Sequence, residues 1–257
     1  MVPVVEQPFR VLMVCTANIC RSATGQLALT TLLPAHDLTS DAVSVTSAGV
    51  AAAGGYSMCE TSEQLLVTAL PDVADAIGAH SSRRLTREFA LAADLILTAD
   101  RSHRGAVVQL APGVRSRVFT LRQAARLATW IVGDSDILRV ACDLAAGRPN
   151  PFPAEDPRSL TAPLPATSRA RLAWLVAEMD ANRGMAPRPT FPAPADSVST
   201  TWHEEDVEDP HVAGWPLHEQ SVTTIVTCSQ EIATALVAVV GGSAISVSGN
   251  RGEAEGA

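Results

Sequence analysis

Lysine is absent from the 257-residue sequence, so all 19 basic side chains are arginines. Acidic residues outnumber them at 27, which gives a formal net charge of −8 at pH 7. The acidic balance is dispersed along the chain, and no basic cluster offsets it. A protein whose main role is to bind nucleic acid carries the opposite pattern, a concentrated basic surface, so we do not place the chain in that class.

Cysteine is also scarce, with five residues. An odd number, in a chain too long to need a disulfide framework, favours a reducing, cytoplasmic location. Glu6 and Arg10 interrupt the apolar residues at the N-terminus, which therefore does not resemble a signal peptide. The apolar stretch 232–247 is shorter than the roughly 20 residues of a membrane span and is broken by Gly241-Gly242. We expect a core-facing terminal helix there, with a membrane span as the lesser alternative.

Strand-like and helix-like segments alternate over the first half of the chain. Apolar residues make up 47% of the sequence, which is enough for a buried core. Short apolar or alternating runs predict strands at 9–15, 43–49, 93–100 and 116–121. Helices are predicted from an N-cap at Ser22 to about Leu33, and then at 59–70, after residue 100, and at 122–132. This alternation predicts an α/β fold, a doubly wound, four-stranded parallel sheet with helices on both faces.

The second half of the chain breaks this pattern. We expect a single domain over 1–257 whose core comprises residues 9–128 and 203–240. Residues 133–201 are proline-rich and predict an insertion that is helical at 136–146 and 166–183 and extended elsewhere. A last long helix is predicted at about 217–240, followed by a disordered tail at 241–257.

A cysteine and an arginine flank the turn that follows the first predicted strand. A loop between a strand and a helix N-terminus directs backbone N–H groups at one point, which favours an anion and a thiolate alike. Cys15 is therefore a candidate nucleophile, Arg21 can hold two phosphate oxygens, and the Ser22 hydroxyl can donate to the Cys15 sulfur. Together they suggest covalent phosphoryl transfer. The alternative is a buried core cysteine in a chance C-x5-R pattern, which the adjoining strand, helix and serine make less favourable.

Departure of a phenolate, whose conjugate acid has a pKa of about 10, calls for a general acid. The candidates are Asp156-Pro157, Asp209-Pro210 and, in reversed order, Pro71-Asp72. Asp209 precedes the last helix and follows a run of acids, so like-charge crowding would favour its protonated form. An ordinary turn explains Asp156, and a solvated acidic loop is the alternative reading of the residues around Asp209.

The sequence VCTANICRS, at residues 14–22, resembles the signature loop of the low-molecular-weight protein tyrosine phosphatases. The likeness continues through TSAGV (46–50), GAHSSRRLT (78–86), ADLILTAD (93–100) and DVEDP (206–210). It leaves residues 133–201 and the tail outside. The arginine-only, alanine-rich composition is typical of a high-GC genome and favours a bacterial, actinobacterial-type member that carries an insertion.

The resemblance implies a role for each residue of the site. Cys15 would be the nucleophile, Arg21 the phosphate clamp and Asp209 the general acid. The phosphate would lie in a loop whose other residues are Thr16, Ala17, Asn18, Ile19 and Cys20. Asn18 would be left-handed, Ser47 and His80 would brace it, and Ser22 would stabilise the leaving thiolate. Cys20 would form a reversible disulfide with Cys15, or else simply pack beneath the loop as a small residue.

The sequence departs from this family in its aromatic residues. Ala53 stands where a tryptophan is common, and His211-Val212 replace an aromatic pair, so phosphate-ester chemistry is better supported than a preference for phosphotyrosine. The expected substrate is a phosphotyrosine protein or a small aryl phosphate, with a bacterial tyrosine kinase as one candidate. The rival functions are a non-catalytic phosphoprotein-binding module and a thiol-dependent arsenate reductase, which would need a close downstream cysteine pair.

No cofactor and no metal are expected from the sequence. His203, His211 and His218 are spaced too irregularly for a metal site. His103 and Arg104 are predicted on a solvated helix face, and Cys59, Cys142 and Cys228 in the core or on helix faces.

Replacing the nucleophile should separate turnover from anion binding. We expect Cys15→Ser to abolish hydrolysis of an aryl phosphate, because the hydroxyl is a far weaker nucleophile, while phosphate or vanadate still binds the loop. Single-turnover trapping should find the phosphoryl group on Cys15 in the wild type. Normal turnover by Cys15→Ser would contradict the assignment.

Overall fold

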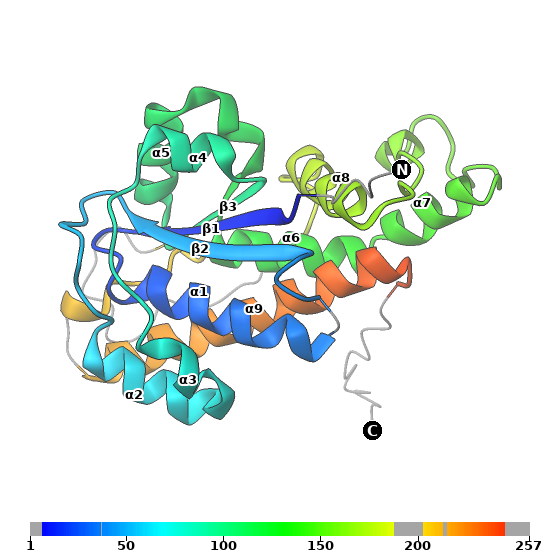
Figure 1. Cartoon of the computed structure of the whole chain (residues 1–257). Helices are drawn as coiled ribbons and strands as arrows, with labels where there is room; N and C mark the ends of the chain where they lie inside the picture. Colours follow the sequence, from blue (N-terminus) through cyan, green and yellow to red (C-terminus); the bar gives the residue numbers. More distant parts are fainter. Residues whose placement is uncertain (1–6, 37, 188–202, 213–214, 245–257) are drawn as a thin grey trace, which may run out of the picture.

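The computed structural model describes residues 7–36, 38–187, 203–212 and 215–244. This part of the chain contains one four-stranded parallel sheet with the strand order β2-β1-β3-β4, covered by helices on both faces (Figure 1). The predicted α/β class and parallel sheet are thereby confirmed. The strands are β1 (Phe9–Cys15), β2 (Val43–Gly49), β3 (Leu95–Thr98) and β4 (Val118–Thr120).

The central strand β1 divides the core into two layers. Because strand side chains alternate, Phe9, Val11 and Met13 face one layer, and Leu12 and Val14 face the other. The first layer is closed by α1 (Arg21–Leu32), α6 (Leu121–Val132) and α9 (Trp215–Gly241), and the second by α4 (Arg87–Ala92) and α5 (Arg101–Leu110). Burial on both faces explains why β1 is a continuous apolar run.

Two smaller helices extend the layer that contains α1. They are α2 (Glu60–Ala69) and α3 (Ala74–Ile77), and Leu66 and Ile77 pack against α1 and α9 in a third apolar cluster. Short 3₁₀ turns, η1 (Pro34–His36), η2 (Pro71–Val73) and η3 (Pro112–Arg117), lie between the longer elements.

Residues 133–187 form helices at the end of the sheet where β1 begins. They contain α7 (Ile137–Ala145), η4 (Pro157–Leu160) and α8 (Ser168–Ala181). Leu172 and Leu175 of α8 enter the main core, and Arg169 forms an ion pair with Asp94 at 2.7 Å. These contacts place α8 at the amino ends of β1 and β3, away from Cys15 (Figure 1). The rest of the predicted insertion, 188–201, and residues 245–257 of the predicted tail lie outside the described residues.

Helix α9 is the one helix in the described part of the chain that is long and apolar enough to cross a membrane. It has 27 residues, because it begins well before the apolar stretch seen in the sequence. In its most apolar window, 56% is buried inside the protein, and Ile225, Ile232 and Leu236 lie in the main core. Packing within the fold accounts for this apolar character, so length and composition are only weak evidence for a span.

The turn between β1 and α1 lies directly against the end of β2. The expectation that Ser22 caps α1 is wrong, because Cys20 is the N-cap residue and Ser22 lies in the first turn of the helix. A Cβ added at Gly49, the last residue of β2, would stand 2.5 Å from the Thr16 carbonyl oxygen and 2.8 Å from the Asn18 nitrogen. Only glycine allows the two backbones to approach this closely.

Gly49→Ala should therefore destabilise the fold. We expect a loss of about 1–3 kcal/mol in the free energy of unfolding, because the added methyl group meets backbone atoms that cannot move independently. Chemical denaturation measures it. Gly105→Ala in α5 is the matched control, since nothing lies within 4 Å of its added Cβ, and it should be neutral or slightly stabilising. Equal stability of the Gly49→Ala variant and the wild type would show that the contact is not required.

Candidate active site

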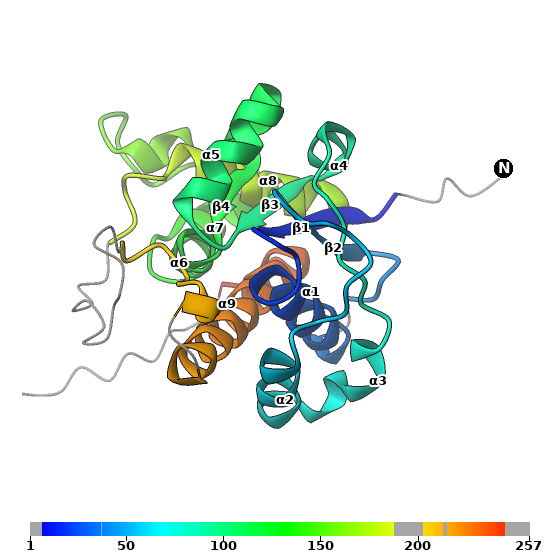
Figure 2. The ribbon, with the colours of Figure 1, turned by 90° about the vertical axis from the view of Figure 1, so that its left-hand side faces the viewer.

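The β1–α1 turn, residues 15–21, lies at the carboxyl end of the sheet, which faces the viewer in Figure 2. Four of its carbonyl groups, those of residues 15, 16, 18 and 19, point outward, because a donor from another segment holds each of them. The Cys15 and Thr16 carbonyls accept from the backbone N–H groups of Val50 and Ala51 at 2.9 Å. The Ile19 carbonyl accepts from the backbone N–H of Cys59 at 2.8 Å.

The orientation of these carbonyls fixes the direction of the loop amides. In a trans peptide the C=O of one residue and the N–H of the next point in opposite directions. With the carbonyls of 15, 16, 18 and 19 held outside, the N–H groups of 16, 17, 19 and 20 face the concave side. Converging amides at a helix N-terminus favour an anion, so the geometry is compatible with the predicted phosphate loop, and anion binding itself stays a prediction.

Asn18 organises the middle of the loop. Its φ is 59°, the left-handed conformation that asparagine tolerates better than most residues. Its Nδ2 donates to Ser22 Oγ at 2.9 Å and to Ser47 Oγ at 2.8 Å. Its carbonyl accepts from His80 Nε2 at 2.8 Å, and its Oδ1 accepts from the Arg83 N–H at 3.0 Å. The structure thus brings together the residues for which bracing of Asn18 was expected.

The nucleophile candidate Cys15 is buried beside Ser22, with 3.0 Å between Sγ and Oγ. Because Ser22 Oγ already accepts from Asn18, its own proton can point at the Cys15 sulfur. A hydroxyl proton in that direction stabilises a thiolate. Ser22 Oγ therefore links the Asn18 side chain, which organises the loop, to the Cys15 sulfur.

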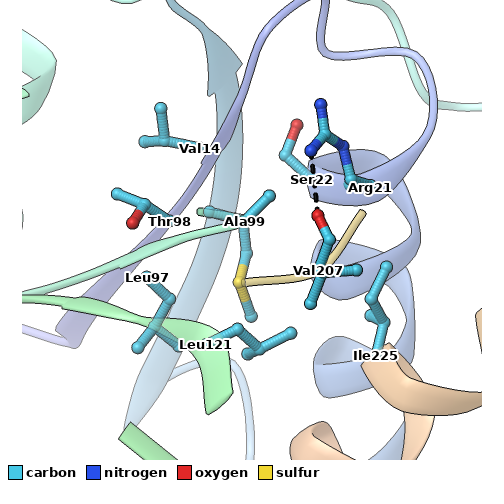
Figure 3. A pocket seen from close by; sticks show the side chains of 10 residues that line it. Val14, Arg21, Ser22, Leu97, Thr98, Ala99, Leu121, Val207 and Ile225 are labelled. Carbon is cyan, nitrogen blue, oxygen red and sulfur yellow. Dashed lines mark hydrogen bonds between the residues drawn. The ribbon is translucent and has the colours of Figure 1, made fainter. Parts of the chain in front are cut away.

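The Arg21 side chain is only 5% exposed and is held by four acceptors. One terminal nitrogen donates to the Val207 carbonyl at 3.0 Å, shown by the dashed line in Figure 3, and to Asp100 at 3.2 Å. The other donates to Asp209 at 2.7 Å and to Thr16 Oγ1 at 3.3 Å. Figure 3 also shows Arg21 and Ser22 beside a small pocket of about 10 Å³. The guanidinium is fixed at the mouth of the loop.

The two aspartates that precede proline have different surroundings. Asp209 contacts Arg21 directly. Asp156 instead pairs with Arg158, whose hydrogen bonds lower the pKa of Asp156 to about 2, and Arg158 also lies 3.9 Å from Asp136, the N-cap residue of α7. Only Asp209 lies at the loop.

The expected crowding of acids around Asp209 is wrong in its details. Glu205 forms an ion pair with Arg126 at 2.9 Å, and Asp206 forms one with Arg101 at 3.2 Å. These two carboxylates are directed at arginines of α6 and α5. The partner that dominates the surroundings of Asp209 is therefore the cation of Arg21.

Sequence reasoning missed two residues of the site, Asp100 and His103. The prediction that His103 lies on a solvated face is wrong, since it is 3% exposed. Its Nε2 lies 2.8 Å from Thr16 Oγ1 and its Nδ1 lies 2.9 Å from Asp100 Oδ2. Burial acts to raise the pKa of Asp100, but its interactions with His103 and Ser102 outweigh burial and hold that pKa well below the usual range. Asp100 follows β3, which pairs with β1 in parallel. A polar residue just after a strand predicted beside β1 was therefore the signal in the sequence that could have placed Asp100 at this site.

Whereas Cys15 contacts Ser22, the Cys20 side chain lies in a cluster with Cys59, His211 and His218. Its Sγ is 3.0 Å from His211 Nε2 and accepts from Ser62 Oγ at 3.4 Å. Cys59 Sγ lies 3.6 Å from His218 Nε2. Burial raises the pKa of Cys20, whereas for Cys59 hydrogen bonds, chiefly from Ser62, outweigh burial and lower it. All five cysteines, which lie in the described part of the chain, are free thiols, so the Cys15–Cys20 disulfide stays a prediction.

The comparisons with known proteins identify one family for this chain. The family model of the low molecular weight phosphotyrosine protein phosphatases matches residues 10–133. The chain is 32% identical over 121 residues to the low molecular weight protein-tyrosine-phosphatase Etp of Escherichia coli, covering 44% of this chain and 69% of that protein. The chain belongs to this family, and it is an enzyme of the protein-tyrosine-phosphatase class.

Two further proteins extend the comparison. The probable phosphatase EpsP of Ralstonia nicotianae is 32% identical over 111 residues, with 43% of this chain and 69% of that protein covered. The crystal structure of the Erwinia amylovora tyrosine phosphatase AmsI superposes with a TM-score of 0.51 at 18% identity, over 90% of this chain and 94% of that chain. The latter likeness supports the fold.

Arg21→Lys should reveal whether the planar guanidinium is needed. Lysine keeps the charge but cannot reach Val207, Asp100 and Asp209 at once, so we expect kcat to fall by roughly 10²- to 10³-fold, as for loss of a key transition-state donor. Steady-state kinetics with an aryl phosphate measure it. Arg104→Lys on the neighbouring helix α5 is the control and should retain activity. A fully active Arg21→Lys variant would mean that the loop amides suffice.

Proposed function

We propose that this enzyme hydrolyses phosphotyrosine or other aryl phosphate monoesters through a phosphocysteine intermediate. One observation carries the proposal: the Cys15 thiol, the Arg21 guanidinium and the Asp209 carboxyl belong to one concave loop and its direct contacts. A nucleophile, a cation for the equatorial oxygens and an acid for the leaving group are what the reaction requires.

In the first step the phosphate dianion enters the loop and takes the guanidinium edge that Asp209 occupies in the structure. The Cys15 thiolate attacks phosphorus, so an S–P bond forms while the P–O bond to the leaving group breaks. Asp209 gives its proton to the departing oxygen. Arg21 and the loop amides hold the remaining oxygens through the transition state.

In the second step water hydrolyses the phosphocysteine. The Asp209 carboxylate takes a proton from the water as its oxygen attacks phosphorus and the S–P bond breaks. The released Cys15 thiolate is stabilised by the Ser22 hydroxyl at 3.0 Å. Inorganic phosphate leaves, and the enzyme returns to its starting state.

The substrate we propose is an aryl phosphate, as a phosphotyrosine side chain or a small molecule, with a bacterial tyrosine kinase as a candidate protein substrate. The family supports the phosphotyrosine class. Ala53 supplies no aromatic wall, but Tyr56, three residues later on the same loop, is 62% exposed and can supply an aromatic contact. A thiolate catalyst requires reducing surroundings, which supports a cytoplasmic location.

A leaving-group series tests the general acid. Asp209→Asn should slow hydrolysis of phenyl phosphate by about 10²- to 10⁴-fold, because phenolate departs poorly without a proton. It should slow hydrolysis of nitrophenyl phosphates much less, because nitrophenolates depart without help. The measurement is the slope of log kcat against the pKa of the leaving group.

Asp156→Asn is the matched control, since it removes the same charge from the other Asp-Pro pair and should leave the slope unchanged. An altered slope in Asp156→Asn, with none in Asp209→Asn, would assign the acid to the segment that contains η4. An unaltered slope in both variants would remove the support for aryl phosphates as the substrate.

A further inference from the structure

Two cysteines and two histidines from four distant segments meet beside the active site. Cys20 ends the phosphate loop, Cys59 is the N-cap of α2, His211 lies in the turn η5 (Pro210–Val212), and His218 lies in the first turns of α9. The two Sγ atoms and one ring nitrogen of each histidine all lie within 4.8 Å of one another. Figure 2 shows α1, α2 and α9 side by side at this end of the molecule. The irregular spacing of the histidines in the sequence therefore does not keep them apart in space.

From this convergence we infer that Cys20, Cys59, His211 and His218 form a structural zinc site. Two thiolates and two imidazoles are a donor set of structural Zn²⁺ sites, and the two thiolates neutralise the ion's charge. Bond lengths of about 2.3 Å to sulfur and 2.0 Å to nitrogen place tetrahedral ligand atoms roughly 3.3–3.8 Å apart. The separations of 3.0 Å for Cys20–His211 and 3.6 Å for Cys59–His218 lie near this range, and the remaining pairs, all within 4.8 Å, would have to close by at most about 1.5 Å.

The surroundings suit a closed, structural site. Cys20 and His218 are buried, Cys59 is half-buried, and His211 is the exposed member on the outer side. The two imidazole rings are perpendicular, with centroids 5.2 Å apart, so both Nε2 atoms can point at one ion without the rings colliding. Ser62 Oγ donates to Cys20 Sγ and would orient that ligand, as outer hydrogen-bond partners do at metal sites.

The bound ion would join three segments that the catalytic site needs. Cys20 precedes Arg21, and His211 follows Asp209 by two residues and donates its backbone N–H to the Asp209 carboxyl at 3.1 Å. Cys59 donates its backbone N–H to the loop carbonyl of Ile19. Cys15 is outside the cluster and contacts Ser22. The ion therefore has a positioning role, and binding it releases the two thiol protons to solvent.

Metal binding to the full chain tests the inference without reference to activity. The chain is purified with a phosphine reductant, stripped of metal and titrated with ZnCl₂ or CoCl₂. We expect one ion per chain, a thiolate-to-cobalt charge-transfer band, and an X-ray absorption first shell of two sulfurs and two nitrogens. Zinc at 100 times its dissociation constant should raise Tm by about 5–10 °C.

Ligand variants identify the residues. Cys59→Ser and His218→Gln should each weaken zinc binding by roughly 100-fold or more, since loss of even an outer partner costs 10–100-fold, and should lose the Tm shift. Cys142→Ser and His36→Gln, which lie outside the cluster, should bind as the wild type does. Circular dichroism of each metal-free variant should match that of the metal-free wild type, which checks that the variant is folded.

Three results would overturn the site. One is the absence of stoichiometric zinc binding by the reduced wild type. Another is zinc binding that Cys15→Ser abolishes and Cys59→Ser does not, which would assign the ion to the nucleophile. The third is wild-type affinity in folded Cys59→Ser and His218→Gln. Because the readout is metal content, loss of the site is distinguishable from loss of the proposed hydrolysis.

Discussion

The outward direction of the loop carbonyls is the constraint on which the rest of the active site depends. The donors come from residues just after β2, from the N-cap of α2 and from His80, so these four carbonyls are held by segments distant in the sequence. If one of these donors were removed, the loop peptide that it restrains could rotate. Its N–H group would then turn away from the concave side of the loop. This explains why TSAGV and GAHSSRRLT accompany the loop sequence. They supply the frame and, at Gly49, the space in which the loop lies.

The second constraint is the electrostatic balance around Arg21. A buried guanidinium requires compensation, and here two carboxylates, Asp100 and Asp209, provide it. His103 and Ser102 fix the Asp100 carboxylate. The Asp209 side chain, by contrast, is 36% exposed and belongs to the segment 203–212, whose regular element is the short turn η5. In the proposed mechanism an incoming dianion would compete with Asp209 and leave Asp100 in place. The arginine would keep its orientation while one of its partners became available to the substrate.

Local patterns were sufficient to predict the sheet and the loop. β1 and β3 are apolar because both faces of each strand are covered, and the residues from Cys15 to Ser22 act within one turn of chain. Local patterns could not predict positions that depend on contacts between segments distant in the sequence. His103 was placed on a solvated face because helix periodicity cannot show that Thr16 lies above it. The capping prediction for Ser22 failed because its hydroxyl is directed to Cys15 and Asn18 rather than to the helix backbone.

Helix α9 runs from one end of the molecule to the other. With 27 residues at about 1.5 Å each it is close to 40 Å long, and its two ends are tied to different structures. His218, near its start, belongs to the cluster beside the phosphate loop, while the Val240 carbonyl, near its end, accepts a hydrogen bond from Arg171 of α8. A stiff rod anchored at both ends transmits axial displacement. A displacement of α8 would therefore act on a helix whose other end is hydrogen-bonded, through Ser221 Oγ and the Glu208 carbonyl, to the segment that carries Asp209.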